Sequence, residues 1–366
     1  MERIVYICAM SRVLGFRPGV CRELIEKEGE LELLFSLKKR ELCRLFPGND
    51  KLVEQLADAS LLDWSKRELE WADSKGIRII PLGDGSYPAL LAECPDAPPL
   101  LFYYGADVLS TPRKVSIVGT RLASARCKEE CFSVVNKIAE YKPVIVSGLA
   151  YGIDAAAHSA ALESGIPTIA VLPNGFDRIY PSRHRDLAKR IAETGGLLTE
   201  YTRNTPPSPL FFIRRNRIIA GISQSTIVIE TRAVGGSIMT VKYAGSYNRD
   251  VYALPGRISE PNSYGCNYLI SRNMASIFVS ASDFAVKSGW NGAGTAYRME
   301  QPDLFSFRKD EKTKILVTLK NYSALDVESI CSITHLGCDI VSQVLLDMEL
   351  TGEVEYRDGR FRLNGK

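Results

Sequence analysis

Three short turns rich in small residues follow apolar, β-branched segments and could together bind an anion. They contain Gly119, Thr120, Arg121 and Ser124 in the first turn, Ser147, Gly148 and Gly152 in the second, and Gly235, Gly236, Ser237 and Thr240 in the third. Glycine lets a backbone approach a ligand closely, and a guanidinium can donate two hydrogen bonds to one phosphate. Because parallel strands end at one edge of a sheet, where helix N-termini present free N–H groups, we expect a single anion site. For any one turn alone, a tight strand-to-helix connection is the simpler interpretation.

Arginine and aromatic side chains are concentrated between residues 174 and 217. Arg183 and Arg185 follow Tyr180-Pro181, and the run Arg215, Asn216 and Arg217 follows Phe211-Phe212. Arginine beside aromatic rings is typical of proteins that hold single-stranded nucleic acid through phosphates and base faces without reading sequence. A solvated charged surface is the alternative for Lys189 and Arg190.

The distribution of charge favours an anionic partner. Residues 101–309 contain 25 Lys and Arg against 16 Asp and Glu, whereas residues 1–100 contain 14 against 17 and residues 310–366 contain 7 against 10. The net charge of +3 therefore hides a basic middle segment between two acidic ones. A field of that sign suits a nucleic acid or a nucleotide.

The sequence offers little support for catalysis, a metal or a cofactor. Asp154 and His158 could share a helix face, but no nucleophile or third ligand accompanies them, so we expect a structural hydrogen bond rather than a catalytic dyad. The first turn has one glycine and the second strand ends in Ser147-Gly148, so the dinucleotide fingerprint is missing. The nine cysteines form no CxxC pair. We expect a non-catalytic protein without a metal or cofactor.

Hydrophobic periodicity divides the chain into segments of different character. Residues 1–70 have helical spacing, and their first break, at 15–19, is either a helix-hairpin-helix turn or a plain connector. Residues 71–287 form the principal domain, in which the expected strands are Val115–Val118, Val144–Val146, Thr168–Leu172, Leu197–Thr199, Thr226–Ile229 and Val251–Leu254. Strands separated by helices in this way predict an α/β fold with a doubly wound parallel sheet.

The last part of the chain reads as a linker followed by a small domain. Residues 288–309 have linker composition, and residues 310–366 show three helical patterns and then a hairpin signal at Asp358-Gly359. This order predicts a winged-helix domain. The third helical pattern, 338–350, contains acids and no Lys or Arg, so we expect the tail to serve protein contacts or regulation rather than DNA binding.

The composition also bears on location. No segment approaches the roughly 18 to 20 apolar residues that span a bilayer, and the N-terminal residues carry charges ahead of a short apolar stretch. We therefore expect a cytoplasmic protein with reduced thiols and no membrane partner.

Several motifs resemble the DNA-processing protein A (DprA, also called Smf) family. They are Gly119-Thr120-Arg121, the block from Ser147 to His158, Tyr180-Pro181, Arg215-Asn216-Arg217-Ile218-Ile219 and Gly236-Ser237-Ile238-Met239-Thr240. The resemblance extends from Tyr87-Pro88 into the tail. The sequence departs from the family pattern at His184, Ile213 and Asn273-Met274, where Asn, Pro and Gly-Ala are usual.

The resemblance implies a Rossmann-like domain with an N-terminal helical module of the SAM or helix-hairpin-helix kind. It also implies a homodimer that binds single-stranded DNA, protects incoming strands during natural transformation and helps load the RecA recombinase. The basic pocket would use Arg121 with Arg183 or Arg185. Two alternatives remain open: a nucleotide-binding enzyme resembling the phosphoribohydrolases, suggested by Gly235-Gly236-Ser237, and a non-catalytic nucleotide sensor.

Overall fold

A computed structural model describes residues 3–14, 17–27, 30–290, 309–322 and 324–364. The chain divides at Gly292 into two compact units, which we call the sheet unit (Met1–Gly292) and the tail unit (Ala293–Lys366). Among the described residues, the sheet unit contains four clusters of buried apolar residues, and the tail unit contains one of its own.

A nine-stranded sheet forms the centre of the sheet unit, in the order β1-β2-β6-β5-β4-β3-β7-β8-β9. Its strands are β1 (Arg78–Pro81), β2 (Leu100–Gly105), β3 (Lys114–Val118), β4 (Val144–Ser147), β5 (Thr168–Val171), β6 (Gly196–Thr199), β7 (Ser225–Val228), β8 (Asp250–Ala253) and β9 (Ser276–Ile277). β3 to β9 pair in parallel, whereas β1 and β2 add an antiparallel edge next to β6. The predicted mixed α/β fold with a mostly parallel sheet is thus confirmed.

The six strands expected from sequence are all present, within one or two residues of their expected bounds. β3 to β7 are completely buried, as expected for short β-branched strands covered on both faces. The antiparallel β1 and β2 were not predicted.

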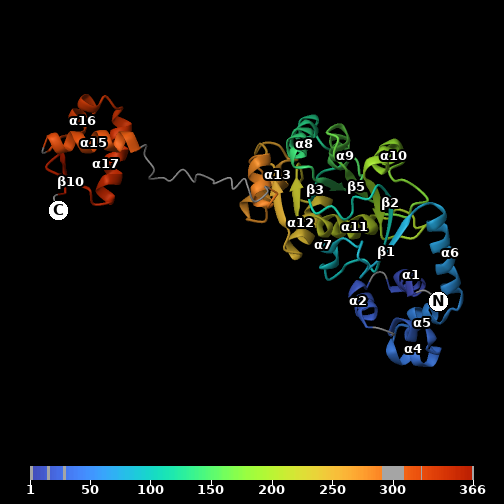
Figure 1. Cartoon of the computed structure of the whole chain (residues 1–366). Coiled ribbons are helices and arrows are strands. Elements are labelled where there is room, and N and C mark those ends of the chain that lie inside the picture. Colours follow the sequence, from blue (N-terminus) through green and yellow to red (C-terminus); the bar gives the residue numbers. More distant parts are fainter. Residues whose placement is uncertain (1–2, 15–16, 28–29, 291–308, 323, 365–366) are drawn as a thin grey trace. The chain divides into compact units, whose positions relative to one another are not determined.

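Helices cover both faces of the sheet (Figure 1). On one face lie α8 (Ala125–Ile138), α9 (Ile153–Glu163), α10 (Arg185–Thr194) and α14 (Ala281–Lys287), and on the other α7 (Ala89–Ala92), α11 (Pro209–Ile222), α12 (Gly236–Ser246) and α13 (Tyr264–Ser271). Two 3-10 turns, η1 (Ala139–Tyr141) and η2 (Ser182–His184), complete the connections. The small residues of α9, such as Ala157 and Ala160, let this helix pack closely on the sheet.

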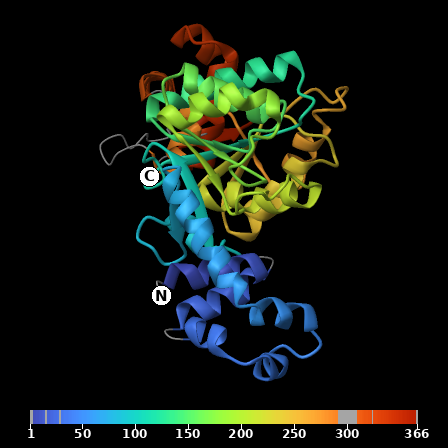
Figure 2. The same ribbon diagram turned by 90° about the vertical axis from the view of Figure 1, so that its right-hand side faces the viewer.

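The N-terminal segment is helical, as predicted. It contains α1 (Arg3–Leu14), α2 (Pro18–Glu26), α3 (Glu30–Ser36), α4 (Lys39–Leu45), α5 (Asp50–Ala57) and α6 (Ser60–Ser74). α6 runs past the expected boundary at residue 70 to the edge of the sheet (Figure 2). The apolar cluster of these helices includes Leu100 and Phe102 of β2, so the helical module shares its core with the sheet edge. Residues 15 and 16, in the expected first break, lie outside the described residues.

The tail unit has three helices and a hairpin. They are α15 (Lys309–Asn321), α16 (Val327–Thr334), α17 (Cys338–Leu350), β10 (Val354–Arg357) and the antiparallel β11 (Arg360–Leu363). The hairpin turns at Asp358 (φ 52°) and Gly359 (φ 80°), both in the left-handed region that a two-residue turn requires. Leu325 bridges to Phe361, which joins the hairpin to the connection before α16.

One part of the expected linker belongs to the sheet unit instead. Trp290 is buried against Phe284, and its Nε1 donates a hydrogen bond to Gln224 Oε1 at 2.7 Å. The glycine-rich composition around Gly289 is typical of a linker and does not indicate that Trp290 is buried. The rest of the expected linker, 291–308, lies outside the described residues.

In the described part of the chain, no single helix is long and apolar enough to cross a membrane. The bent pair α16 and α17 meets the length and composition criteria only when taken together, at an angle of 116°.

Candidate nucleic-acid interface

The sheet reverses its order at β3, which lies between β4 and β7. The chain runs from β3 outward through β4, β5 and β6, and then returns to place β7 on the other side of β3. In open parallel sheets, ligands bind at the carboxyl ends of the strands at such a switch point. Here the turn after β3 and the turn after β7 are joined by backbone hydrogen bonds: Thr120 N–H donates to Glu230 O at 2.7 Å, and Ile229 N–H donates to Val118 O at 3.1 Å.

Two glycines let these turns pack tightly. A Cβ at position 119 would lie 2.5 Å from Ile153 Cγ1, and a Cβ at position 152, where φ is +79°, would lie 2.2 Å from Thr120 O. A side chain at either position would push the first and second turns apart. These glycines therefore act by bringing the turns together.

A cleft of about 590 Å³ opens at the switch point; we call it the switch-point cleft. The sequence-predicted residues that line it are Gly119, Thr120, Arg121, Arg215, Asn216, Gly235, Gly236, Ser237 and Thr240. The first and third predicted turns thus meet in one cavity, with α11 as a shared wall. Ala150 and Asp154, which belong to the second turn and the start of the helix that follows it, also line the cleft.

Arg121, Phe212 and Tyr180 form one wall of this cleft. The Arg121 guanidinium lies 4.7 Å from the centroid of the Phe212 ring, and the Tyr180 ring meets Phe212 edge-on at 5.4 Å. Arg121 is exposed, and Tyr180 is 41% exposed. A guanidinium stacked on a ring keeps its N–H groups available for a phosphate, and an exposed ring offers a face or edge to a base.

The N-terminus of α12 borders the same cleft. Its N-cap is Gly235, which supplies no side-chain hydrogen bond, so the first-turn N–H groups are not capped by that residue. Asn216 Nδ2 donates to Gly236 O at 3.1 Å, and Ser237 Oγ donates to Thr231 Oγ1 at 2.7 Å. These bonds hold the start of α12 in place, where its dipole favours an anion.

Two buried charged residues, Arg215 and Asp154, line the cleft. Arg215 Nη1 donates to Gly148 O at 2.6 Å and also to Val171 O. Burial lowers the pKa of Arg215 to about 10, and burial raises the pKa of Asp154, against the opposing effect of Arg215. Arg215 therefore ties α11 to the strand ends, and its charge adds to the field of the cleft.

Several predicted site residues lie outside the switch-point cleft, engaged in the framework around it. Ser124 caps α8 by accepting Cys127 N–H at 3.2 Å, Ser147 Oγ donates to Ile117 O at 2.7 Å, and Gly148 and Gly152 pack against Arg215 and Thr120. Arg217 lies on another face of α11, where Nη2 donates to Glu200 Oε2 at 2.5 Å. These residues shape the cleft indirectly.

Arg183 and Arg185 lie on the η2 side. Both are exposed; Arg185 lines an adjoining hollow of about 480 Å³ that shares Tyr180 with the switch-point cleft, and Arg183 lines neither. The two arginines form a basic rim beside Tyr180.

Sequence reasoning missed some lining residues, notably Leu122, Ile213 and Arg232. The sequence pattern places Phe212 and Tyr180 beside arginines but does not assign them to the site. Their signal was the aromatic position itself, immediately before a basic run or before proline.

His158 does not form a dyad with Asp154. Its Nδ1 lies 2.7 Å from Thr168 Oγ1, and burial lowers its pKa to about 3. Asp154 Oδ2 instead accepts Ala150 N–H at 3.4 Å. Each side chain has a structural partner, and among the described residues no His, Cys, Asp and Glu cluster could hold a metal ion.

His184, one of the departures from the usual pattern, has a defined structural role. Its Nδ1 donates to Leu149 O at 2.8 Å, and its ring meets Tyr151 edge-on at 5.0 Å. It therefore fastens η2 to the second turn.

A mostly parallel sheet covered by helices on both faces, with a cleft at its switch point, defines a broad class of α/β proteins. Within this class, residues 78–288 match the family model of DNA recombination-mediator protein A. The chain belongs to the DNA recombination-mediator protein A family.

Relatives and solved structures agree with this assignment. The chain is 33% identical to Protein Smf of Synechocystis sp. over 78% of its own length and 72% of that protein, and 42% identical to DNA processing protein DprA of Streptococcus pneumoniae over 55% and 70%. The crystal structure of the Streptococcus pneumoniae protein superposes with a TM-score of 0.64, 31% identity and coverage of 78% of this chain and 99% of that one. DNA processing protein A from Helicobacter pylori, studied for its single-stranded DNA binding mode, gives a TM-score of 0.52, 29% identity and coverage of 57% and 95%.

Proposed function

We propose that this protein binds single-stranded DNA in the switch-point cleft, without catalytic turnover. The observation that carries the proposal is the wall of Arg121, Phe212 and Tyr180 facing the N-terminus of α12. The guanidinium and the helix N-terminus contact phosphates, and the rings stack with bases. None of these contacts depends on base identity, so binding tolerates any sequence.

Membership of the family supports a proposed cellular role. The protein protects incoming single strands during natural transformation and helps to load RecA onto them, acting as a cytoplasmic homodimer. The single-strand binding mode of the Helicobacter pylori relative supports the choice of ligand.

The flanking modules serve this role differently. The N-terminal helices form a module of the SAM or helix-hairpin-helix kind, and the three helices and hairpin of the tail form a winged-helix domain. The tail contributes protein contacts or regulation, because α17 contains Asp339, Asp347 and Glu349 and no Lys or Arg. Such a helix would be repelled by the phosphates of a DNA groove.

An enzymatic alternative, hydrolysis of a nucleotide, is less well supported by the carboxylates near the cleft. Glu230 is buried, and its Oε2 accepts Ser124 N–H at 3.0 Å. Asp154 is buried beside Arg215. Both carboxylates are used to hold turns together and not to approach a substrate as an acid and base pair.

Titration of labelled single-stranded and double-stranded oligonucleotides at two salt concentrations, with and without mononucleotides, tests the proposal. We expect salt-dependent binding that strongly prefers single strands and is only weakly displaced by mononucleotides. Equal affinity for duplexes would refute the proposed ligand. Displacement by micromolar mononucleotide would favour a nucleotide sensor.

A further inference from the structure

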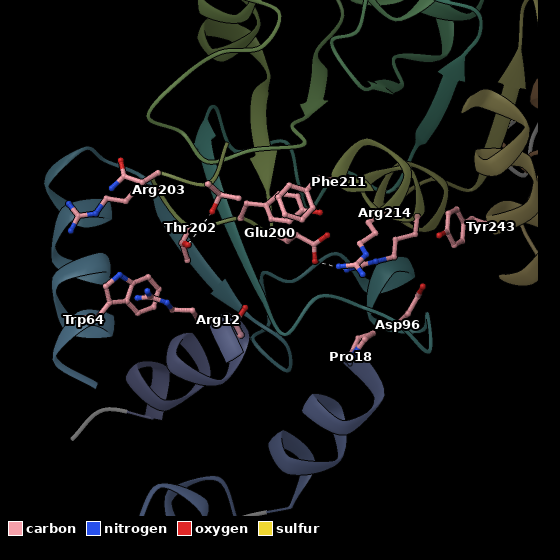
Figure 3. Close-up of a pocket in the computed structure, with 15 residues that line it drawn as sticks. Arg12, Pro18, Trp64, Asp96, Glu200, Thr202, Arg203, Phe211, Arg214 and Tyr243 are labelled. Carbon is pink, nitrogen blue, oxygen red and sulfur yellow. Dashed lines mark hydrogen bonds and ion pairs between the residues drawn. The ribbon is translucent and has the colours of Figure 1, made fainter. Parts of the chain in front are cut away.

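α11 presents basic and aromatic side chains on two of its faces. Phe212, Arg215 and Asn216 line the switch-point cleft, whereas Phe211, Arg214 and Arg217 line a second pocket of about 550 Å³ (Figure 3). Phe211, Arg214 and Arg217 recur every three residues, and Phe212 and Arg215 are likewise three residues apart but one position later. The two sets therefore occupy adjacent faces of the helix. The helix therefore separates two cavities of similar composition.

The second pocket lies between the helical module and the sheet. Arg12 of α1, Trp64 of α6 and Pro18 of α2 form its lower side, and the segment Glu200–Thr205 after β6 forms another (Figure 3). Arg203 joins the two sides, because its Nε lies 2.9 Å from Glu68 Oε2 and its N–H donates to Glu68 Oε1 at 2.6 Å. The fold holds this pocket open between fixed walls.

The carboxylates of the second pocket are already engaged. Glu200 forms an ion pair with Arg217 at 2.5 Å, and Asp96 accepts the Tyr247 hydroxyl at 2.5 Å. Arg12, in contrast, is exposed and stacks on the Trp64 ring with its guanidinium carbon 4.0 Å from the centroid. Its positive charge acts on the nearby carboxylates of Glu68 and Asp58, but among the described residues its guanidinium forms no direct ion pair, so its N–H groups can receive an anion.

The aromatic lining matches that of the switch-point cleft. Phe211 packs on Tyr201 at 4.7 Å between centroids, as Phe212 packs on Tyr180, and the Arg12–Trp64 stack parallels that of Arg121 on Phe212. Guanidinium groups on aromatic rings provide both a phosphate donor and a surface for a base. Both cavities thus offer the same chemistry to the same kind of ligand.

The start of α11 contributes residues to both cavities. Pro209 lines the switch-point cleft, Phe211 and Thr205 line the second pocket, and Leu210 between them is 49% exposed. Resting on the proposed function, we propose that the second pocket is a further nucleotide site for the same single strand. The strand passes over the N-terminal turn of α11 and places a phosphate on Arg12. The helical module is then part of the DNA-binding surface.

A length series of oligothymidylates, from roughly 4 to 16 nucleotides, tests this path with the full-length protein. The Arg12→Glu variant reverses an exposed charge, and Arg44→Glu, an exposed arginine of α4 outside the pocket, is the matched control. We expect Arg12→Glu to weaken binding of the longest oligonucleotide about tenfold or more and to leave the shortest unchanged. Arg44→Glu should have less than a twofold effect at every length. The milder Arg12→Gln should show the same dependence on length with a smaller loss.

The failure of this inference can be told apart from the failure of the proposed function. If Arg121→Ala weakens binding at every length while Arg12→Glu behaves like Arg44→Glu, the second site is refuted and the proposed function stands. If free thymidine monophosphate binds in the second pocket and Arg12→Glu weakens the binding of oligonucleotides of every length equally, the continuous path is refuted. If no oligonucleotide binds the wild-type protein, both proposals fall.

Discussion

Replacing Arg121 with alanine tests the proposed cleft at an exposed cation of its wall. The guanidinium stacks on Phe212, and within the described part of the chain it forms no hydrogen bond or ion pair, whereas Arg215 donates to two backbone carbonyls. Loss of an exposed cation–π contact costs about 0.5–1 kcal/mol of stability, so the variant should fold. Loss of one charge-assisted contact to a phosphate should cost about 1–3 kcal/mol of binding free energy.

This free energy corresponds to roughly 5- to 150-fold in Kd. Removing one phosphate contact on a single strand should also lower the slope of log affinity against log salt by about 0.7. Fluorescence anisotropy of a labelled single strand at several salt concentrations measures both quantities. Arg190→Ala, an exposed arginine of α10 that lines no described cavity, is the control and should change neither. A folded Arg121→Ala protein with wild-type affinity and salt slope would remove this residue from the site.

Three further outcomes follow from the structure. The purified protein should release no more than a stoichiometric amount of product from mononucleotides, because Glu230 and Asp154 are committed to framework contacts; turnover that Glu230→Gln abolishes would contradict this. A chain ending at Asp303 should retain single-strand affinity within about tenfold of the full chain, because α17 carries no basic residue; a larger loss with an unchanged oligomeric state would show that the tail binds DNA. Burial lowers the pKa of His158 from 6.5 to about 3, so the unfolded chain takes up a proton at a higher pH than the folded chain does. The free energy of unfolding should therefore fall from pH 6.5 toward pH 3, with a contribution of roughly 1.4 kcal/mol per pH unit that His158→Gln removes. Identical pH profiles of the wild-type protein and the variant in urea titrations would refute this prediction.

The sequence was sufficient to predict the parallel sheet, because its strands are short β-branched runs buried on both faces. It was insufficient for β1 and β2, whose partners lie far away in sequence: Phe102 pairs with both Ile79 and Thr199. The same applies to Trp290, whose burial depends on packing against Phe284 and not on its glycine-rich neighbours. The positions of β1, β2 and Trp290 depend on contacts with residues far away in sequence, and local sequence patterns do not indicate such contacts.

The candidate site was predicted at the level of turns more successfully than at the level of side chains. Parallel topology brings the turns at Gly119 and Gly235 to one edge, and the structure has both in one cleft. Within α11, residues two positions apart point in different directions. Arg215 therefore contacts Gly148, whereas Arg217 contacts Glu200. A run of arginines in sequence therefore did not reveal which of them face a ligand.

The central claim is that a single strand occupies the switch-point cleft, and photochemical crosslinking tests it most directly. An oligonucleotide containing 5-bromodeoxyuridine would be irradiated in complex with the full-length protein, and the modified peptides would be mapped by mass spectrometry. We predict adducts at Tyr180 and Phe212, the rings beside Arg121, and their loss in the presence of excess unlabelled single strand. Adducts confined to the tail unit, with neither ring modified, would contradict the account.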